Sequence, residues 1–140
     1  MSKLGIMQGR LLPKYLNHYQ AHPVNEWFRE FNLAQKLKLN YIEFIIDFDC
    51  YESNPLMTVD GLKKIMFYSE NSGVKVESIC ADIFMQKPIF DNLYDKSELL
   101  AIFKKLLDAS KELGIKDIVL PLVDKSSIYN CKNINDFEKI

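Results

Sequence analysis

The sequence predicts an α/β fold in which strands and helices alternate along the 140-residue chain. Two observations support this class. Short apolar segments recur roughly every 40 residues, and segments with helical spacing of apolar residues separate them. Glycines follow two of the helical segments, at the position where a left-handed cap is favoured. Strands that alternate with helices form parallel sheets with right-handed crossovers, so we expect the order βαβαβαβ followed by a partial helix.

The first unit combines a strand at residues 3–10 with a helix that follows a polar loop. Asn25 is a suitable N-cap for this helix, and Glu26 places an acidic residue in its first turn. We expect the helix to end at residues 39–40. Its apolar positions recur close to helical spacing and are Trp27, Phe28, Phe31, Ala34 and Leu37.

The second unit consists of a strand at residues 41–47 and a helix at residues 59–72. Pro55 lies in the loop between them and prevents an earlier helix start. Gly73 stands where a left-handed C-terminal cap is expected. The apolar face of this helix contains Leu62, Ile65, Met66 and Ser69.

The third unit begins with a strand at residues 74–84 and contains the clearest helix of the sequence. Asp95 or Ser97 caps the start of that helix, and Gly114 caps its end. Its amphipathic pattern predicts one buried face. The apolar stripe consists of Leu99, Ile102, Phe103, Leu106, Leu107 and Leu113.

The fourth unit has a strand at residues 116–124 and a helix that begins near Ile134. We expect residues 1–140 to be one domain and the amino-terminal piece of a longer protein, cut within the fourth helix. The spacing suits the first four βα units of a (β/α)8 barrel. It also suits a small doubly wound sheet. A natural half-barrel that pairs with a second copy, giving a homodimer, is the alternative to a truncated chain.

Composition excludes several classes of protein. The chain is 48% hydrophobic, which argues against disorder, and three cysteines argue against a disulfide scaffold. No apolar run approaches the roughly 18 residues of a membrane span, and the amino terminus does not resemble a signal peptide. A cytoplasmic setting is expected. The 18 basic and 19 acidic residues disfavour nucleic acid as a partner and are compatible with a small-molecule site.

Polar side chains at the carboxyl ends of the expected strands are the candidates for a binding site, because ligands bind there in parallel α/β folds. Asp47, Asp49 and Cys80 also fall at these ends. No catalytic residue or metal ligand is assigned. The residues we expect to bind substrate are Gln8, Arg10, Glu43, Asp82, Asp124 and Ser126.

Each candidate has a structural alternative. Glu43 lies within an apolar strand, so its carboxylate needs a partner. A salt bridge to Arg10 or a lysine would supply one, or the residue lies on a solvated outer face. Arg10 is equally suited to clamp a phosphate or carboxylate. Ser126 offers a hydroxyl to a phosphate or caps a turn.

The histidines and cysteines suggest less chemistry. His18 and His22 are four residues apart but lie in a loop, so a surface pair is favoured over a metal site. Cys80 is expected to be a small core residue. Neither pattern predicts a catalytic group.

The sequence resembles the sugar phosphate isomerase/epimerase family, which has xylose isomerase-like TIM barrels and belongs to the endonuclease IV superfamily. The resemblance rests on the opening GIMQGRL, the segment WFREF and the segment LKLNYIEF. The later segments ICADIFMQKP and IVLPLVDKSSI extend it along nearly the whole chain.

The resemblance implies a (β/α)8 barrel that moves a proton beside the carbonyl of a sugar or sugar phosphate, using carboxylates and a divalent metal such as Mn²⁺, Mg²⁺ or Zn²⁺. In the epimerase branch the metal ligands come from the second half of the barrel, so none is assigned to this chain, which alone is expected to be inactive. The nuclease branch takes histidines from early strands. The corresponding ends here carry Asp47, Asp49, Cys80 and Asp82, which argues against an endonuclease IV-like phosphodiesterase.

Overall fold

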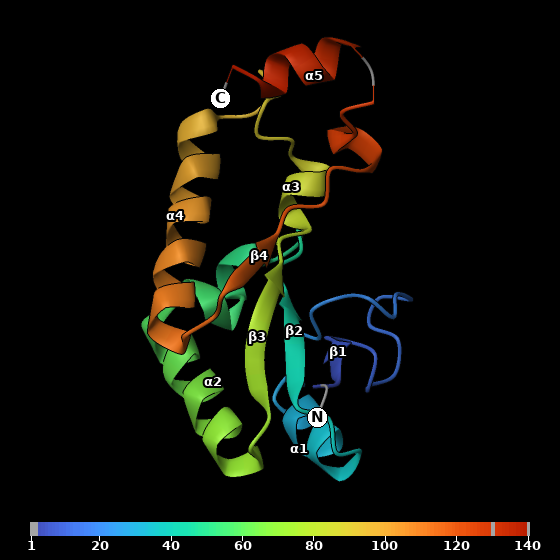
Figure 1. Cartoon of the computed structure of the whole chain (residues 1–140), viewed down its shortest axis with the longest axis vertical. Helices are drawn as coiled ribbons and strands as arrows, with labels where there is room; N and C mark the ends of the chain where they lie inside the picture. Colours follow the sequence, from blue (N-terminus) through green and yellow to red (C-terminus); the bar gives the residue numbers. More distant parts are fainter. Residues whose placement is uncertain (1–2, 130, 140) are drawn as a thin grey trace.

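The computed structural model describes residues 3–129 and 131–139 and contains one four-stranded sheet (Figure 1). All strand pairs are parallel, and the strand order follows the sequence. The strands are β1 (Gly5–Met7), β2 (Tyr41–Ile45), β3 (Lys75–Cys80) and β4 (Asp117–Val119). The helices are α1 (Arg29–Lys36), α2 (Val59–Ser72), α3 (Ile83–Gln86), α4 (Lys96–Leu113) and α5 (Cys131–Phe137). Short 3-10 helices are η1 (Tyr51–Ser53), η2 (Pro55–Met57) and η3 (Asp124–Ser126). The predicted α/β class and parallel sheet are confirmed, and the arrangement is compatible with part of a barrel.

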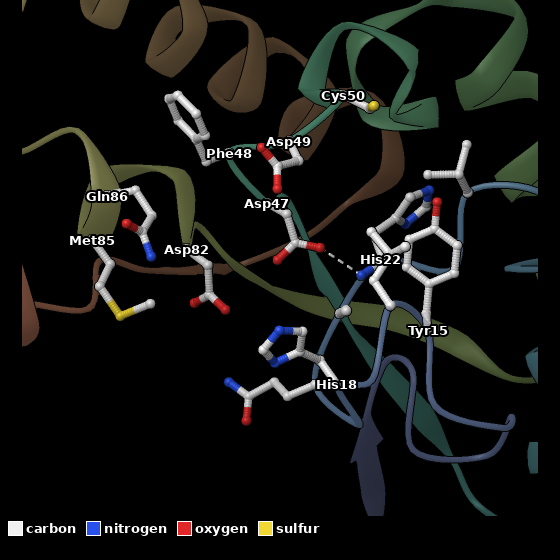
Figure 2. A pocket seen from close by; sticks show the side chains of 14 residues that line it. Tyr15, His18, His22, Asp47, Phe48, Asp49, Cys50, Asp82, Met85 and Gln86 are labelled. Atoms are coloured by element: carbon white, nitrogen blue, oxygen red, sulfur yellow. Dashed lines mark hydrogen bonds between the residues drawn. The ribbon is translucent and has the colours of Figure 1, made fainter.

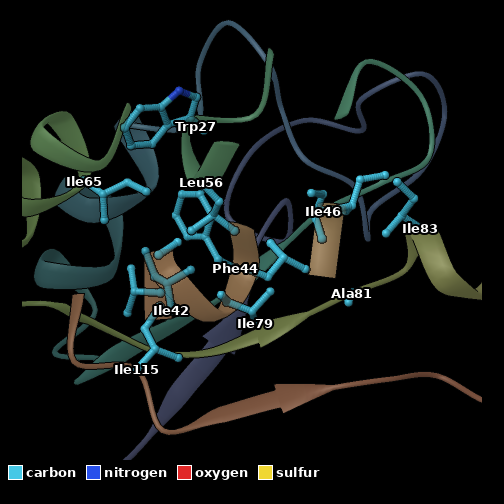
Figure 3. Close-up of a cluster of buried hydrophobic side chains, with 14 of the residues drawn as sticks. Trp27, Ile42, Phe44, Ile46, Leu56, Ile65, Ile79, Ala81, Ile83 and Ile115 are labelled. Atoms are coloured by element: carbon cyan, nitrogen blue, oxygen red, sulfur yellow. The ribbon is translucent and has the colours of Figure 1, made fainter. Parts of the chain in front are cut away.

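The core lies between one face of the sheet and helices α1, α2 and α4. Alternate residues of β2 point to this face, where Ile42 and Phe44 are fully buried. Trp27 packs edge-on against Phe44 at a ring-centroid distance of 5.8 Å. Figure 3 shows this cluster, which Ile65 of α2 joins from the helical side. The other face of the sheet carries Glu43, which is only partly buried.

The bounds predicted for the helix at residues 59–72 are confirmed by α2. Of the two N-caps proposed for the next long helix, α4, the structure has Asp95. The Thr58 hydroxyl accepts a hydrogen bond from the Gly61 N–H at the start of α2. Asp95 accepts one from the Ser97 N–H at the start of α4. Gly73 and Gly114 end these helices with φ angles of 73° and 71°. The two C-terminal glycine caps therefore form as predicted.

The first helix begins later than predicted. Asn25 is not its N-cap, because residues 23–28 form hydrogen-bonded turns and α1 starts at Arg29. The Glu26 and Trp27 N–H groups both donate to the Pro23 carbonyl oxygen, which replaces a first helical turn. The helix ends at Lys36 and not at residues 39–40, and Leu37 just beyond it is 61% exposed and does not join the core.

The strands are shorter than the apolar runs that predicted them. Beyond β3 the chain turns into α3, so residues 83–84 are helical. Beyond β4 it continues without regular structure to η3, so the predicted strand end at Asp124 is wrong. Leu107 is 49% exposed on α4, although the stripe placed it in the core. The last helix starts at Cys131 and not near Ile134.

Within the described residues, no helix combines the length and apolar character needed to cross a bilayer.

Candidate functional site

A cavity of about 360 Å³ lies beyond the carboxyl ends of β1, β2 and β3 (Figure 2). Its volume falls within the range of small-molecule sites, roughly 300–1,000 Å³. Three segments form its wall: the loop after β1, the residues that follow β2, and α3 together with the residue before it. Polar groups in the wall include Tyr15, His18, His22, Asp47, Asp82 and Gln86. This cavity is the candidate functional site.

Asp47 projects into the cavity wall two residues after β2 ends. Its Oδ2 accepts a hydrogen bond from the His22 N–H at 2.6 Å. Burial raises the pKa of Asp47 above its ordinary value, and the neighbouring Asp82 and Asp49 carboxylates raise it further. The His22 N–H and the charge of His18 act in the opposite direction without cancelling the rise. Asp47 therefore holds a proton more readily than an exposed aspartate.

Asp82 occupies the corresponding position after β3 and is 8% exposed. Its Oδ1 accepts a hydrogen bond from the Cys80 thiol at 3.0 Å. Burial, and then this carboxylate, raise the pKa of Cys80. The thiol stays protonated near neutral pH, so Cys80 is the buried structural residue that the sequence predicted and not a nucleophile.

His22 is buried, which contradicts the predicted surface pair with His18. His22 is 4% exposed, and its Nδ1 lies 3.0 Å from Oε1 of the fully buried Gln8. That oxygen also accepts the Ile45 N–H at 3.1 Å, so Gln8 joins β2 to the cavity wall. Burial lowers the pKa of His22 to about 4, which keeps the ring neutral. Only His18 of the pair is exposed.

Glu30 of α1 is a further functional candidate, because it fixes the loop that leads into the cavity wall. The side chain is 0% exposed, and Oε1 accepts hydrogen bonds from the Gly9 N–H at 2.8 Å and the Leu11 N–H at 3.3 Å. Burial raises the pKa of Glu30 to about 7. Gly9 has a φ of 86°, and a Cβ there would lie 2.4 Å from the Ala21 carbonyl oxygen. The turn after β1 is thereby packed against the segment that enters the cavity.

Of the predicted substrate-binding residues on the first three strands, Arg10 and Glu43 lie outside the cavity wall. Arg10 is exposed, and its guanidinium donates to Gln20, a wall residue, at 3.1 Å. Glu43 lies outside the cavity wall and accepts a hydrogen bond from the Ser78 hydroxyl at 2.6 Å. No ion pair between Arg10 and Glu43 forms among the described residues. Asp82 is the one candidate that lies in the wall itself.

Asp124 and Ser126 lie away from the cavity, in η3. Asp124 is exposed and adopts a left-handed φ of 52°. The buried Ser126 hydroxyl donates to the carbonyl oxygens of Pro121 at 2.7 Å and Val123 at 2.9 Å. These bonds support the turn-forming alternative for Ser126, while substrate contact at both residues remains a prediction.

The described residues do not assemble a metal site. No group of three or more histidine, cysteine or acidic side chains among them is arranged to hold a metal ion. The cavity offers carboxylate oxygens as hydrogen-bond acceptors, because Asp47 and Asp82 line it just beyond the ends of the neighbouring strands β2 and β3. That arrangement suits ligands with several hydroxyl donors.

Sequence reasoning noted Asp47 and Asp49 as strand-end residues but did not include them among the substrate-binding residues, and it missed Glu30 entirely. Asp47 carried the same signal as Asp82, since both follow a buried strand at its carboxyl end. Glu30 carried none, because acidic side chains on helices are usually solvated.

Comparisons with known proteins give no further assignment. No family model matches the chain, and a search of curated proteins finds no match to it.

Proposed function

We propose that this chain forms the substrate-binding half of a sugar or sugar phosphate isomerase/epimerase barrel. The remaining four βα units and the ligands for a divalent metal would come from a second half, as the resemblance implies. The observation that carries the proposal is the meeting of Asp47 and Asp82 in the wall of one cavity. Both residues follow neighbouring parallel strands, at the edge where α/β enzymes bind their ligands.

The chemistry of the cavity supports a polyhydroxylated ligand. Carboxylate oxygens accept hydrogen bonds from sugar hydroxyls, and the exposed His18 adds an imidazole ring to the wall. The raised pKa of Asp47 brings its proton affinity closer to that of a group that exchanges protons near neutral pH. In this proposal the half described here contributes substrate contacts, and the metal ligands come from the second half, as the resemblance implies.

A phosphodiesterase of the endonuclease IV type is less well supported. The cavity wall contains Asp47, Asp49 and Asp82, and none of the residues that the structure places in it is lysine or arginine. A phosphate backbone requires the opposite charge.

A non-catalytic half-barrel that assembles with another chain is a second candidate. Strands β1 and β4 are the edges of the described sheet, and Val119 on β4 is 43% exposed. Unpaired edges favour strand addition. A second copy would place its β4 beside β1 and close an eight-stranded ring, which a mass measurement in solution detects as a homodimer.

The proposal is tested by titrating the 140-residue chain with free and phosphorylated ketoses while recording backbone amide NMR spectra. We expect resonances near Asp47 and Asp82 to move on sugar addition. Asp47→Asn should weaken binding about tenfold, since a hydrogen bond to a charged group is worth roughly 1.5 kcal/mol. Asp117→Asn is the matched control, because Asp117 is exposed on β4 and outside the cavity wall.

The activity is measured as deuterium uptake from solvent at the carbon beside the sugar carbonyl. The 140-residue chain should show none by itself, and exchange should appear when a second half and a divalent metal are added. Binding of no sugar, or equal weakening by Asp47→Asn and Asp117→Asn, contradicts the proposal.

A further inference from the structure

One atom of the cavity wall lacks a partner that its surroundings should provide. Nε2 of His22 is buried and makes no hydrogen bond with any described residue. Buried polar atoms in proteins are nearly always hydrogen-bonded, so an unpaired one calls for a specific explanation. His22 is one of the residues that line the cavity, so a ligand bound there lies beside its ring.

The hydrogen bond at Nδ1 of His22 determines whether Nε2 donates or accepts. Oε1 of Gln8 can only accept hydrogen bonds, and it already accepts the Ile45 N–H. Nδ1 of His22, 3.0 Å from the same oxygen, must therefore carry the ring proton. The ring is neutral, so Nε2 presents a lone pair and accepts a hydrogen bond without donating one.

The charged groups of the wall select the same kind of ligand. Asp47, Asp49 and Asp82 accept hydrogen bonds and disfavour an anion. The cations Arg10 and Lys87 contact wall residues without belonging to the wall. Arg10 donates to Gln20, and Lys87 Nζ lies 4.9 Å from the centre of the Phe48 ring and 3.5 Å from Glu98.

We infer that the cavity binds the uncharged, hydroxyl-bearing end of its sugar, and that His22 Nε2 accepts a hydrogen bond from one of the hydroxyl groups. This inference rests on the proposed function and extends it. His22 is a specificity-determining residue in this assignment, and Gln8 is the residue that positions its ring. A phosphate group, where the sugar carries one, lies outside this cavity.

The predicted site residue Gln8 thereby acquires a role other than direct contact. It is fully buried and does not line the cavity, so it acts on the ligand through the His22 ring. This explains why a glutamine stands at the end of β1 in an otherwise apolar setting. An apolar residue there would leave the Ile45 N–H and the ring proton unpaired.

The experiment uses the 140-residue chain with ¹⁵N-labelled histidine, D-fructose as the neutral probe and D-fructose 6-phosphate as the charged one. Fructose should shift the His22 Nε2 resonance upfield, as expected for a ring nitrogen that gains a hydrogen-bond donor. The phosphate ester should bind no more tightly than the free sugar. The measurement on the unaltered chain does not depend on how any variant folds.

Two substitutions separate the ring nitrogens. His22→Asn keeps an amide donor near the position of Nδ1 and removes the acceptor at Nε2, so it should weaken fructose binding about five- to tenfold. His22→Gln places an amide oxygen near the Nε2 position and should retain most of the affinity. Amide spectra establish that each variant is folded before it is titrated.

The outcomes distinguish this inference from the function it rests on. If fructose moves the resonances of Asp47 and Asp82 while the Nε2 resonance stays fixed, the role of His22 is wrong and the sugar site stands. If the phosphate ester binds more tightly and its phosphate moves the same wall resonances, the inference that the cavity binds the uncharged end of the sugar is wrong. If neither sugar binds, the inference and the proposed function are both overturned.

Discussion

Beneath α2 and α4 the sheet buries almost only apolar side chains, whereas the segment between β1 and α1 is fixed by buried polar ones. Phe44 and Ile79 represent the first region, with 0% exposure and no polar atom in either side chain. Gln8, His22 and Glu30 represent the second, and each has one buried side-chain atom without a partner among the described residues. Apolar packing tolerates small shifts, but buried polar groups lose stability once a partner moves. The cavity thus lies beside the polar region, where small shifts of a side chain cost more stability.

The largest expected effect is in the apolar region. Phe44→Ala removes a fully buried ring that contacts Trp27 at 5.8 Å and Phe31 at 6.5 Å between centroids. Its free energy of unfolding in urea should fall by about 3–5 kcal/mol. Leu107→Ala is the matched control on α4, where 49% exposure limits the loss to about 0.5 kcal/mol. Equal losses in the two variants would show that the described core is wrong.

A smaller effect is expected in the polar region. Glu30→Ala leaves the Gly9 and Leu11 N–H groups without their acceptor, so the free energy of unfolding should fall by about 1–3 kcal/mol. Glu30→Gln keeps a carbonyl oxygen at that position and should cost less than about 1 kcal/mol. Urea unfolding at pH 6 measures both. A glutamine variant as unstable as the alanine variant contradicts the hydrogen-bonding role.

The smallest expected effect is the pH dependence of the free energy of unfolding. Glu30 and His22 change this free energy in opposite directions as pH rises. The pKa of Glu30 is raised from 4.5 to about 7, so its folded form keeps a proton that the unfolded form loses, and stability falls as pH rises through this window. The pKa of His22 is lowered from 6.5 to about 4, so its contribution rises with pH between those values. The contributions of Glu30 and His22 should therefore largely cancel between pH 4.5 and 6.5.

Single substitutions reveal each contribution. Glu30→Gln should leave a stability that rises with pH in this window, and His22→Phe should leave one that falls. Each slope corresponds to at most about 3 kcal/mol over the window, and the difference from the unaltered chain removes the contribution of other titrating groups. Urea midpoints at pH 4.5, 5.5 and 6.5 measure both slopes. Parallel curves for the three proteins would contradict the assignment.

The same contrast explains which features the sequence could predict. Periodicity predicted the parallel α/β fold, and Pro55 and Gly73 set the two ends predicted for α2, because both residues act through local geometry. The end of β4 was misplaced, since apolar residues continue to Val123 after strand pairing stops at Val119. Asp82 was predicted as a strand-end side chain. The burial of His22 and Glu30 was not, because it depends on how the loop after β1 folds onto β2 and α1.

The parallel order of the sheet also sets a sequence of events during folding. Gly5 pairs with Tyr41, and Tyr41 with Lys75. About 35 further residues must therefore be synthesised after each of these strands before its partner strand can pair with it. Such non-local pairing slows folding. At ribosomal rates of roughly 5–20 residues per second, β1 spends about two to seven seconds without β2 during synthesis. Its apolar residues Ile6 and Met7 are exposed to other chains throughout that interval, and rapid translation or a chaperone should raise the yield of folded protein.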